Sequence, residues 1–235
     1  MVPAAQENTF TPALGKHWLT PFYDLSIALT TREQTWRKAL VQLISPKPSE
    51  IILDIGCGTA SLDIAIARIA PGVRITGIDP DPAILSIARH KVAKAGVNIA
   101  FVQDYGDALG RHFEINTVDK VFSGLMLHHV TVQTKRAIFQ AAFDVLKPGG
   151  SLYIADFGEQ KTPLSRTLFK TIQRLDGFET TQPNAEGVLP KLMEASGFQN
   201  VAEKQVIMTP VGSISLYYAE KPMDEAQIRD LDYTN

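Results

Sequence analysis

The chain has 235 residues, of which 45% are hydrophobic and 20% are charged, so it can bury the core of a single domain. Its formal net charge of -2 and its pI of about 6.2 provide no positive field for a phosphate backbone, which argues against nucleic acid as a partner. The chain has a lone cysteine, no secretory signal and no apolar run near the roughly 18 residues of a membrane span, which predicts a cytoplasmic protein. We expect a monomer or a homodimer.

The first part of the chain, residues 1–48, precedes the first predicted strand. Its stretch REQTWRKALVQLI has a helical period, which predicts an amphipathic helix. Because this helix comes directly before the sheet, we expect the segment to form a lid over the carboxyl edge of the sheet.

Residues 49–157 form the predicted core, in which short β-branched runs alternate with stretches of helical period. This alternation is typical of β-α units and a parallel sheet. Strands are expected at residues 51–55, 73–78, 99–103, 120–123 and 151–157. Helices are expected at residues 62–70, 83–95 and 135–146.

A helical insertion follows at residues 158–198, with a helix that should begin at Thr162-Pro163 and stop at Gly177. Residues 199–221 contain two late strands, and the four residues TPVG between them suit a hairpin. The predicted fold class is therefore α/β: a doubly wound, mostly parallel seven-stranded sheet with an antiparallel C-terminal hairpin and an N-terminal helical lid.

The stretch LDIGCGTA occupies the turn after the first strand, where open α/β sheets commonly bind nucleotides. Gly56 and Gly58 allow the backbone to bend tightly and approach a ligand, although a lone GxG is as often simple turn chemistry. Asp79 ends the second strand, where a carboxylate can accept hydrogen bonds from both ribose hydroxyls of NAD or of S-adenosylmethionine. Asp54 would repel a pyrophosphate but could hold a methionine ammonium, unless it is a satisfied strand-end carboxylate.

Further motifs follow in order: GIDPD at residues 77–81, QDYGD at 103–107, an LHH segment within 118–130 and VLKPGGSLYIADF at 145–157. This set resembles that of the class I S-adenosylmethionine-dependent methyltransferases, from Tyr23 onward. The entry segment FYDLSIALTTREQTWRKALVQLI is similar to that of methyltransferases acting on ubiquinone and menaquinone precursors.

The resemblance implies a Rossmann-like fold, S-adenosylmethionine as cofactor and a set of cofactor-binding positions. These positions are Tyr23, Asp54, Gly56, Cys57, Gly58, Asp79, Pro80, Asp104, Tyr105 and Ser123. The chain departs from the family pattern at Ala60, where the third glycine usually stands, and after the third strand, where Leu-Pro-Phe is missing. The adenine contact is therefore either Asp104 or Tyr105, and Asp104 is favoured.

Two of these positions have specific interpretations. Cys57 lies between glycines with no identifiable cation or base nearby, so we expect a small apolar filler whose backbone faces the ligand. Tyr23 belongs to the lid, where its ring could support the sulfonium by a cation-π contact or could simply pack at a hinge.

Methyl transfer requires a base only when the acceptor is protonated. His128 and His129 follow the fourth strand and are the candidate bases, although each could instead cap the strand and pack beside the next helix. Asp156 ends the fifth strand and could orient an acceptor or hydrogen-bond to backbone. The sequence indicates no metal site.

The insertion helix has an apolar face that suggests a roof over a hydrophobic or aromatic acceptor, or an ordinary cover for the sheet. That face comprises Leu164, Leu168, Phe169, Ile172 and Leu175. Its basic residues leave open a weak contact with a membrane surface, and Asp176 and Glu179 could instead recognise a cationic acceptor.

The function favoured by these observations is methyl transfer to a small apolar or aromatic acceptor, by C- or O-methylation. A tRNA or protein methyltransferase is disfavoured by the acidic pI and by the lack of a basic stripe. A regulatory or scaffolding protein that binds the cofactor without transferring methyl groups remains an alternative, because no motif dictates a catalytic residue.

Overall fold

The computed structural model describes residues 31–224 of the chain. The elements follow the expected order, with helices between the strands. They are α2 (Glu33–Ile44), β1 (Ile51–Ile55), α3 (Ser61–Ile69), β2 (Arg74–Ile78), α4 (Pro82–Ala95), β3 (Ala100–Val102), the 3-10 turn η2 (Leu109–Arg111), β4 (Val118–Gly124), the 3-10 turn η3 (Leu127–His129), α5 (Val132–Val145), β5 (Leu146–Phe157), α6 (Pro163–Asp176), α7 (Phe178–Ala185), α8 (Val188–Ala195), β6 (Gln199–Thr209) and β7 (Gly212–Glu220).

The strands form one seven-stranded sheet in the order β3-β2-β1-β4-β5-β7-β6. The first five strands pair in parallel, and β7 pairs antiparallel with both β5 and β6. The strand order reverses between β1 and β4, the kind of position at which open α/β sheets bind ligands. The predicted α/β class and the mostly parallel seven-stranded sheet are confirmed, including the antiparallel pair at the C-terminus.

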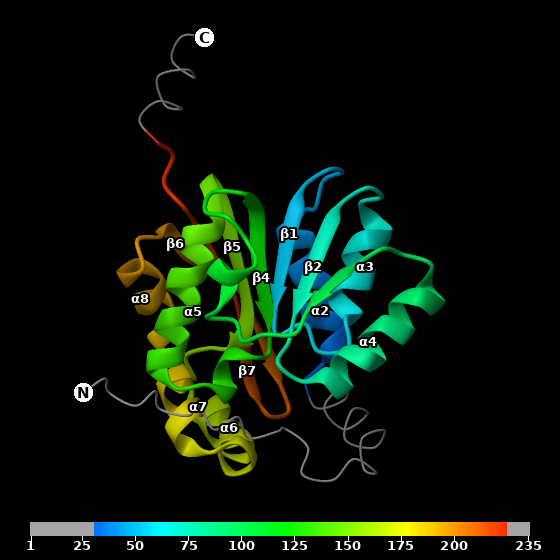
Figure 1. Cartoon of the computed structure of the whole chain (residues 1–235). Helices are drawn as coiled ribbons and strands as arrows, with labels where there is room; N and C mark the ends of the chain where they lie inside the picture. Colours follow the sequence, from blue (N-terminus) through cyan, green and yellow to red (C-terminus); the bar gives the residue numbers. More distant parts are fainter. Residues whose placement is uncertain (1–30, 225–235) are drawn as a thin grey trace, which may run out of the picture.

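Helices cover both faces of the sheet (Figure 1). The core on one face contains apolar side chains from α2, α3 and α4, and the core on the other face contains those of α5 and α8. Strand β1 alternates between these cores, because Ile52 lies in the first and Leu53 and Ile55 lie in the second. Asp54 therefore shares the face that α2 and α3 cover.

Helix α2 lies along a face of the sheet, so the prediction that this segment caps the carboxyl edge is wrong for the described residues. At one end, the Trp36 ring packs against Gly124, the last residue of β4. At the other end, Lys120 Nζ near the start of β4 donates to the Ser45 carbonyl at 3.0 Å. The buried stripe of α2 explains this position, because it needs an apolar surface as long as the helix. Tyr23 lies outside the described residues.

Two strands differ from the expected pattern. Strand β5 begins five residues earlier than predicted, since Leu146 already pairs with Val118 and the KPGG segment continues the strand with Gly149 at φ 77°. The pairing of β6 with β7 shifts register twice, between Gln199 and Ala202 and between Glu203 and Gln205. Such irregularities bend and twist a strand locally.

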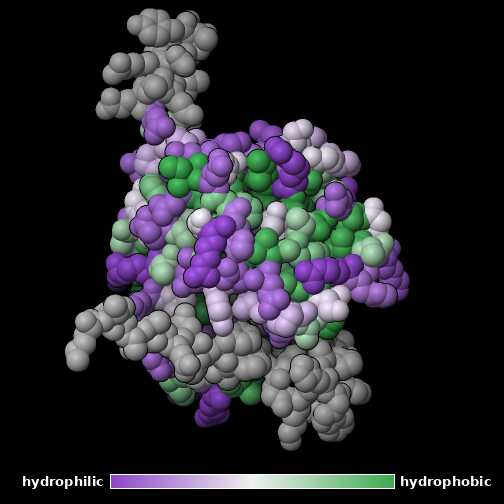
Figure 2. Space-filling view, viewed as in Figure 1, coloured by the Kyte–Doolittle hydropathy of each residue, from purple (hydrophilic) through white to green (hydrophobic). Residues whose placement is uncertain are grey.

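Helices α6 and α7 of the insertion lie beyond the carboxyl ends of β4 and β5, at the lower end of the sheet, whereas α8 lies beside α5 (Figure 1). Figure 2 shows hydrophilic side chains spread among hydrophobic ones over the viewed face. Among residues 31–224, no helix combines the length and the apolar content that crossing a membrane requires.

Candidate active site

The glycine loop after β1 has the backbone conformation that its residues suggest. Gly56 and Gly58 have φ values of 74° and 53°, in the left-handed region that favours glycine. A Cβ at Gly56 would lie 2.4 Å from Met126 Cγ, so only glycine fits there, whereas a Cβ at Gly58 would meet no atom within 4 Å. Ala60 also has a left-handed φ of 59°. The loop therefore packs tightly on the η3 side and is open at Gly58.

Asp79 holds this loop in place. Its Oδ2 accepts a hydrogen bond from the Gly58 N–H and its Oδ1 accepts one from the Asp81 N–H, each at 3.0 Å. Asp79 is half-buried, and burial raises the pKa of its carboxyl. Each oxygen keeps a lone pair that a ribose hydroxyl can use. Pro80 beside it is half-buried and leads to Asp81, which caps α4 through the Ala83 N–H.

Asp54 is accompanied by a second buried carboxyl, Asp63 in the first turn of α3, which the sequence reasoning missed. The two residues are 2% and 0% exposed. Among the described residues, Asp54 Oδ1 and both Asp63 oxygens have no hydrogen-bond donor. Burial raises the pKa of Asp54, and the neighbouring Asp63 raises it further. Burial also raises the pKa of Asp63, to about 7.

Cys57 is packed as an apolar filler. It is 8% exposed, and a Cβ on Gly77 would lie 2.8 Å from its Sγ. Burial raises the pKa of the thiol, and the negative charge of Asp54 raises it further. Because only a thiolate is strongly nucleophilic, this geometry supports the structural interpretation of Cys57.

Asp104, the favoured adenine contact, forms an ion pair with side chains of the segment that follows β3. Asp104 Oδ2 lies 2.8 Å from His112 Nε2 and 3.5 Å from Arg111 Nη1, and its Oδ1 accepts from the Tyr105 N–H at 2.8 Å. The hydrogen bond with His112 lowers the pKa of Asp104. Tyr105 is 39% exposed. The choice between Asp104 and Tyr105 stays a prediction.

The Ser123 side chain is used inside the protein, and its contact with the cofactor stays a prediction. It is 1% exposed, and its hydroxyl donates to the Ile55 carbonyl at 2.6 Å. The side chain therefore joins the ends of β4 and β1. A serine at the end of a buried strand needs such an internal acceptor, because a buried hydroxyl without a partner is costly.

The loop and its surroundings fit S-adenosylmethionine. Asp54 offers a buried oxygen without a donor, the feature that a cofactor ammonium would satisfy. Asp79 has lone pairs for the ribose, and Gly58 leaves open space beside the loop. When bound, the cofactor supplies an electrophilic methyl group on a sulfonium, and the residues of the loop bind and orient it.

His128 forms a hydrogen bond with the buried carboxylate of Asp156. Its Nδ1 lies 2.8 Å from Asp156 Oδ1, and Asp156 also accepts from the Leu127 and Phe157 N–H groups at 2.8 and 2.7 Å. Burial alone would raise the pKa of Asp156, but His128 lowers it below the usual value. In the tautomer in which Nδ1 donates to this carboxylate, Nε2 of a neutral His128 carries the lone pair.

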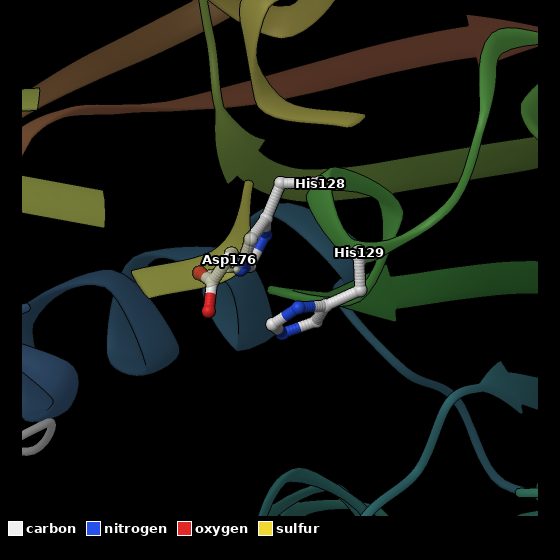
Figure 3. Close-up of side chains that lie close together, drawn as sticks. All are labelled: His128, His129 and Asp176. Atoms are coloured by element: carbon white, nitrogen blue, oxygen red, sulfur yellow. Dashed lines mark ion pairs between the residues drawn. The ribbon is translucent and has the colours of Figure 1, made fainter. Parts of the chain in front are cut away.

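Two further groups surround His128 (Figure 3). Asp176 Oδ2, at the end of α6, lies 3.6 Å from His128 Nε2, and burial raises the pKa of this carboxyl. The ring of His129 lies 4.0 Å from the ring of His128, centroid to centroid. His128 is buried and His129 is exposed. The structure thus brings together residues from η3, β5 and α6.

Helix α6 has the predicted ends, with Thr162 capping its first turn and Gly177 following its last residue. Its predicted apolar face is only partly buried, because Phe169 is 1% exposed whereas Leu164 and Leu175 are 62% and 70% exposed. The helical periodicity of the apolar residues could not show which part of this wide apolar face packs against the sheet. That α6 roofs an acceptor pocket stays a prediction.

Lys135 on α5 is another residue that the sequence reasoning missed. It is fully buried, and its Nζ donates to the Val130 and Thr180 carbonyls at 2.7 Å each. Burial lowers its pKa to about 8. Lys135 thereby joins the segment after η3 to α7, beside the histidine pair, and no local pattern in the sequence indicated this role.

Comparison with known proteins agrees with this geometry. Residues 52–150 match the family model of the methyltransferase domain. Phosphoethanolamine N-methyltransferase 1 of Arabidopsis thaliana is 28% identical over 165 residues, 70% of this chain and 32% of that protein. The demethylmenaquinone methyltransferase of Listeria monocytogenes is 29% identical over 160 residues, 66% of each chain. This chain therefore spans about a third of the first relative and about two thirds of the second.

A solved structure with the same fold is that of Haemonchus contortus phosphoethanolamine N-methyltransferase 2 with phosphomonomethylethanolamine and S-adenosylhomocysteine. It superposes with a TM-score of 0.63 at 18% identity, over 80% of this chain and 53% of that one. Residues 52–150 are therefore similar to a methyltransferase domain, and the glycine loop within them fits S-adenosylmethionine as the cofactor.

Proposed function

We propose that the protein transfers the methyl group of S-adenosylmethionine to a small apolar or aromatic acceptor, at a hydroxyl or a ring carbon. The observation that carries this proposal is the His128–Asp156 pair beside the glycine loop. Met126, two residues before His128, packs directly against Gly56 of that loop. This packing supports His128 as a proton acceptor next to the cofactor, on the side where α6 and α7 lie.

The chemistry of this arrangement is an in-line displacement. The acceptor atom forms a bond to the methyl carbon, the sulfur–methyl bond breaks, and its electron pair returns to sulfur to give S-adenosylhomocysteine. The acceptor proton goes to His128 Nε2, since Nδ1 is bound to Asp156. Holding both reactants in line can contribute about 7 to 11 kcal/mol to lowering the barrier.

The acceptor is inferred from the side chains near the carboxyl edge and from the relatives. Leu164, Leu175 and Phe178 on α6 and α7 expose apolar surface. The Listeria relative is named for demethylmenaquinone, a quinone-type acceptor. An amine is the second candidate, favoured by Asp176 beside His128 and by relatives named for phosphoethanolamine.

In this proposal, the His129 side chain contacts the acceptor. It is exposed and in ring contact with buried His128, so it can touch an acceptor without displacing core residues. Tyr23 remains the proposed cover for the methionine end of the cofactor. Cytoplasmic location, monomer or homodimer formation and a weak membrane-surface contact likewise stay predictions.

The test begins with calorimetric titration of the purified protein with S-adenosylmethionine and, separately, with NAD. We expect binding of S-adenosylmethionine, weakened by about 1.5 to 3 kcal/mol in Asp79→Ala because ribose hydrogen bonds are lost. Binding of NAD alone would contradict the proposal. The exposed His90→Asn on α4 is the matched control, with unchanged affinity.

The second step measures methyl transfer from labelled S-adenosylmethionine to panels of phenols, quinols and amines. His128→Asn is expected to lower turnover at least 100-fold while cofactor affinity stays unchanged. Cofactor binding without transfer to any panel, or to tRNA and protein substrates only, would favour a regulatory protein or a macromolecular methyltransferase.

A further inference from the structure

We propose that His128, His129 and Asp176 bind one divalent transition-metal ion, and that Asp156 orients His128 toward it. This inference goes beyond the proposed function, which uses no metal, and it differs from the sequence analysis, which indicated no metal site. Ligand atoms of the three side chains all lie within 4.8 Å of one another (Figure 3).

The spacing of these atoms suits one small ion. Two ligand atoms on a tetrahedral ion, each about 2.1 Å from it, are about 3.4 Å apart. His128 Nε2 and Asp176 Oδ2 are 3.6 Å apart, close to this value and too far for a good hydrogen bond. His129 must turn inward slightly to complete the set. His129 is exposed, and the rotation changes its ring contact with His128.

Asp156 provides the support that metal-binding histidines usually have. A ligating imidazole commonly donates its other N–H to a carboxylate, which fixes the tautomer and the ring orientation. His128 does so through Nδ1, at 2.8 Å from Asp156 Oδ1. Asp156 is 1% exposed and is held by the Leu127 and Phe157 N–H groups. The Nε2 lone pair is therefore aimed in advance at the space beside Asp176.

The local charge also favours a cation. Asp156 and Asp176 both lie against one imidazole, and in residues 31–224 neither forms an ion pair with a lysine or an arginine. Lys135 uses its Nζ on the Val130 and Thr180 carbonyls. Two imidazoles and one carboxylate suit Zn²⁺, Co²⁺ or Fe²⁺ better than Mg²⁺ or Ca²⁺, which prefer oxygen ligands.

Three protein ligands leave one position open on a tetrahedral ion, as in catalytic metal sites. A nitrogen that binds a metal cannot also accept a proton, so the ion and the proton are alternative occupants of His128 Nε2. In the loaded protein an acceptor hydroxyl would take the open position and release its proton to solvent.

The test uses untagged, chelator-treated protein in calorimetric titrations with ZnCl₂ and CoCl₂, without S-adenosylmethionine. We expect one ion per chain at micromolar affinity or tighter. His129→Asn and Asp176→Asn should each weaken binding at least tenfold, and Asp156→Asn by about 10 to 100-fold. His90→Asn, an exposed histidine on α4, should leave the affinity unchanged. Bound Co²⁺ should show the visible absorption of a tetrahedral site.

The double variant His129→Asn/Asp176→Asn decides the outcome, because neither change removes a core side chain. Metal affinity equal to that of the wild type, or a loss of affinity in His90→Asn, would overturn the site. Titration of the same variants with S-adenosylmethionine separates this failure from failure of the proposed function. Intact cofactor binding without metal binding refutes the metal site alone.

Discussion

The buried carboxyl pair makes the stability of the protein without cofactor depend on pH in an unusual direction. Burial raises the pKa of Asp63 from 3.8 to about 7. Between these values the unfolded chain has released the proton and the folded protein still binds it, so the free energy of unfolding falls as pH rises. From pH 5 to pH 8 the difference spans about two pKa units, or roughly 3 kcal/mol.

Urea unfolding of the protein without cofactor at pH 5, 6, 7 and 8 measures this effect. The wild type is expected to lose stability across this range, with the urea dependence unchanged. Asp63→Asn should lose at least half of the pH dependence, because its amide does not titrate and can donate to Asp54. The remainder belongs to Asp54, Asp79 and Asp176, whose pKa values burial also raises. His129 opposes them, because desolvation lowers its pKa to about 3 and its contribution to stability rises with pH.

Asp224→Asn is the matched control, since Asp224 is exposed and forms no part of the pair. It should follow the wild-type curve. The reasoning is refuted if Asp63→Asn has the same pH dependence as the wild type, since the contributions of the other titrating groups, including His129, are present in both proteins.

Three further predictions concern packing and the loop. Gly56→Ala should destabilise the protein by about 2 to 4 kcal/mol in urea unfolding, because it adds a clash to a left-handed backbone. Gly58→Ala should cost only about 1 kcal/mol of stability and should weaken cofactor affinity in a titration. Lys135→Met should cost about 2 kcal/mol, since two buried carbonyls lose their donor, and equal stability would contradict this role. Phe169→Ala should cost about 3 to 5 kcal/mol and Leu175→Ala less than about 0.5, so similar losses would refute the observed burial.

The elements of the fold could be predicted because their signals are local. A capping threonine before proline and a following glycine fixed both ends of α6. The place of α2 could not be predicted, because a buried stripe shows that a helix needs a partner but not which surface provides it. The early start of β5 was missed because KPGG has the composition of a turn while its backbone continues the strand.

The conformation of the glycine loop was predictable because its motif lies on consecutive residues. Asp63 and Lys135 were missed because a charged residue on an amphipathic helix acquires meaning only from its tertiary neighbours. The cofactor contact of Ser123 stays a prediction, and its hydrogen bond to the Ile55 carbonyl could not be read from the motif because the two residues lie on different strands. The approach of Asp176 to His128 joins residues far apart in the chain, and no spacing rule reveals it.

The C-terminal hairpin leaves a long strand, β6, at one edge of the sheet, and unpaired backbone along such an edge invites pairing with a second molecule. The two register shifts in β6 interrupt the regular row of backbone N–H and C=O groups that such pairing needs. Glu203 and Lys204 add charge in the same stretch, and Lys161 pairs with Glu203 from outside the strand. At the opposite edge, β3 is only three residues long. The sheet therefore resists edge-to-edge aggregation at both ends by different means, one strand being too irregular to extend and the other too short.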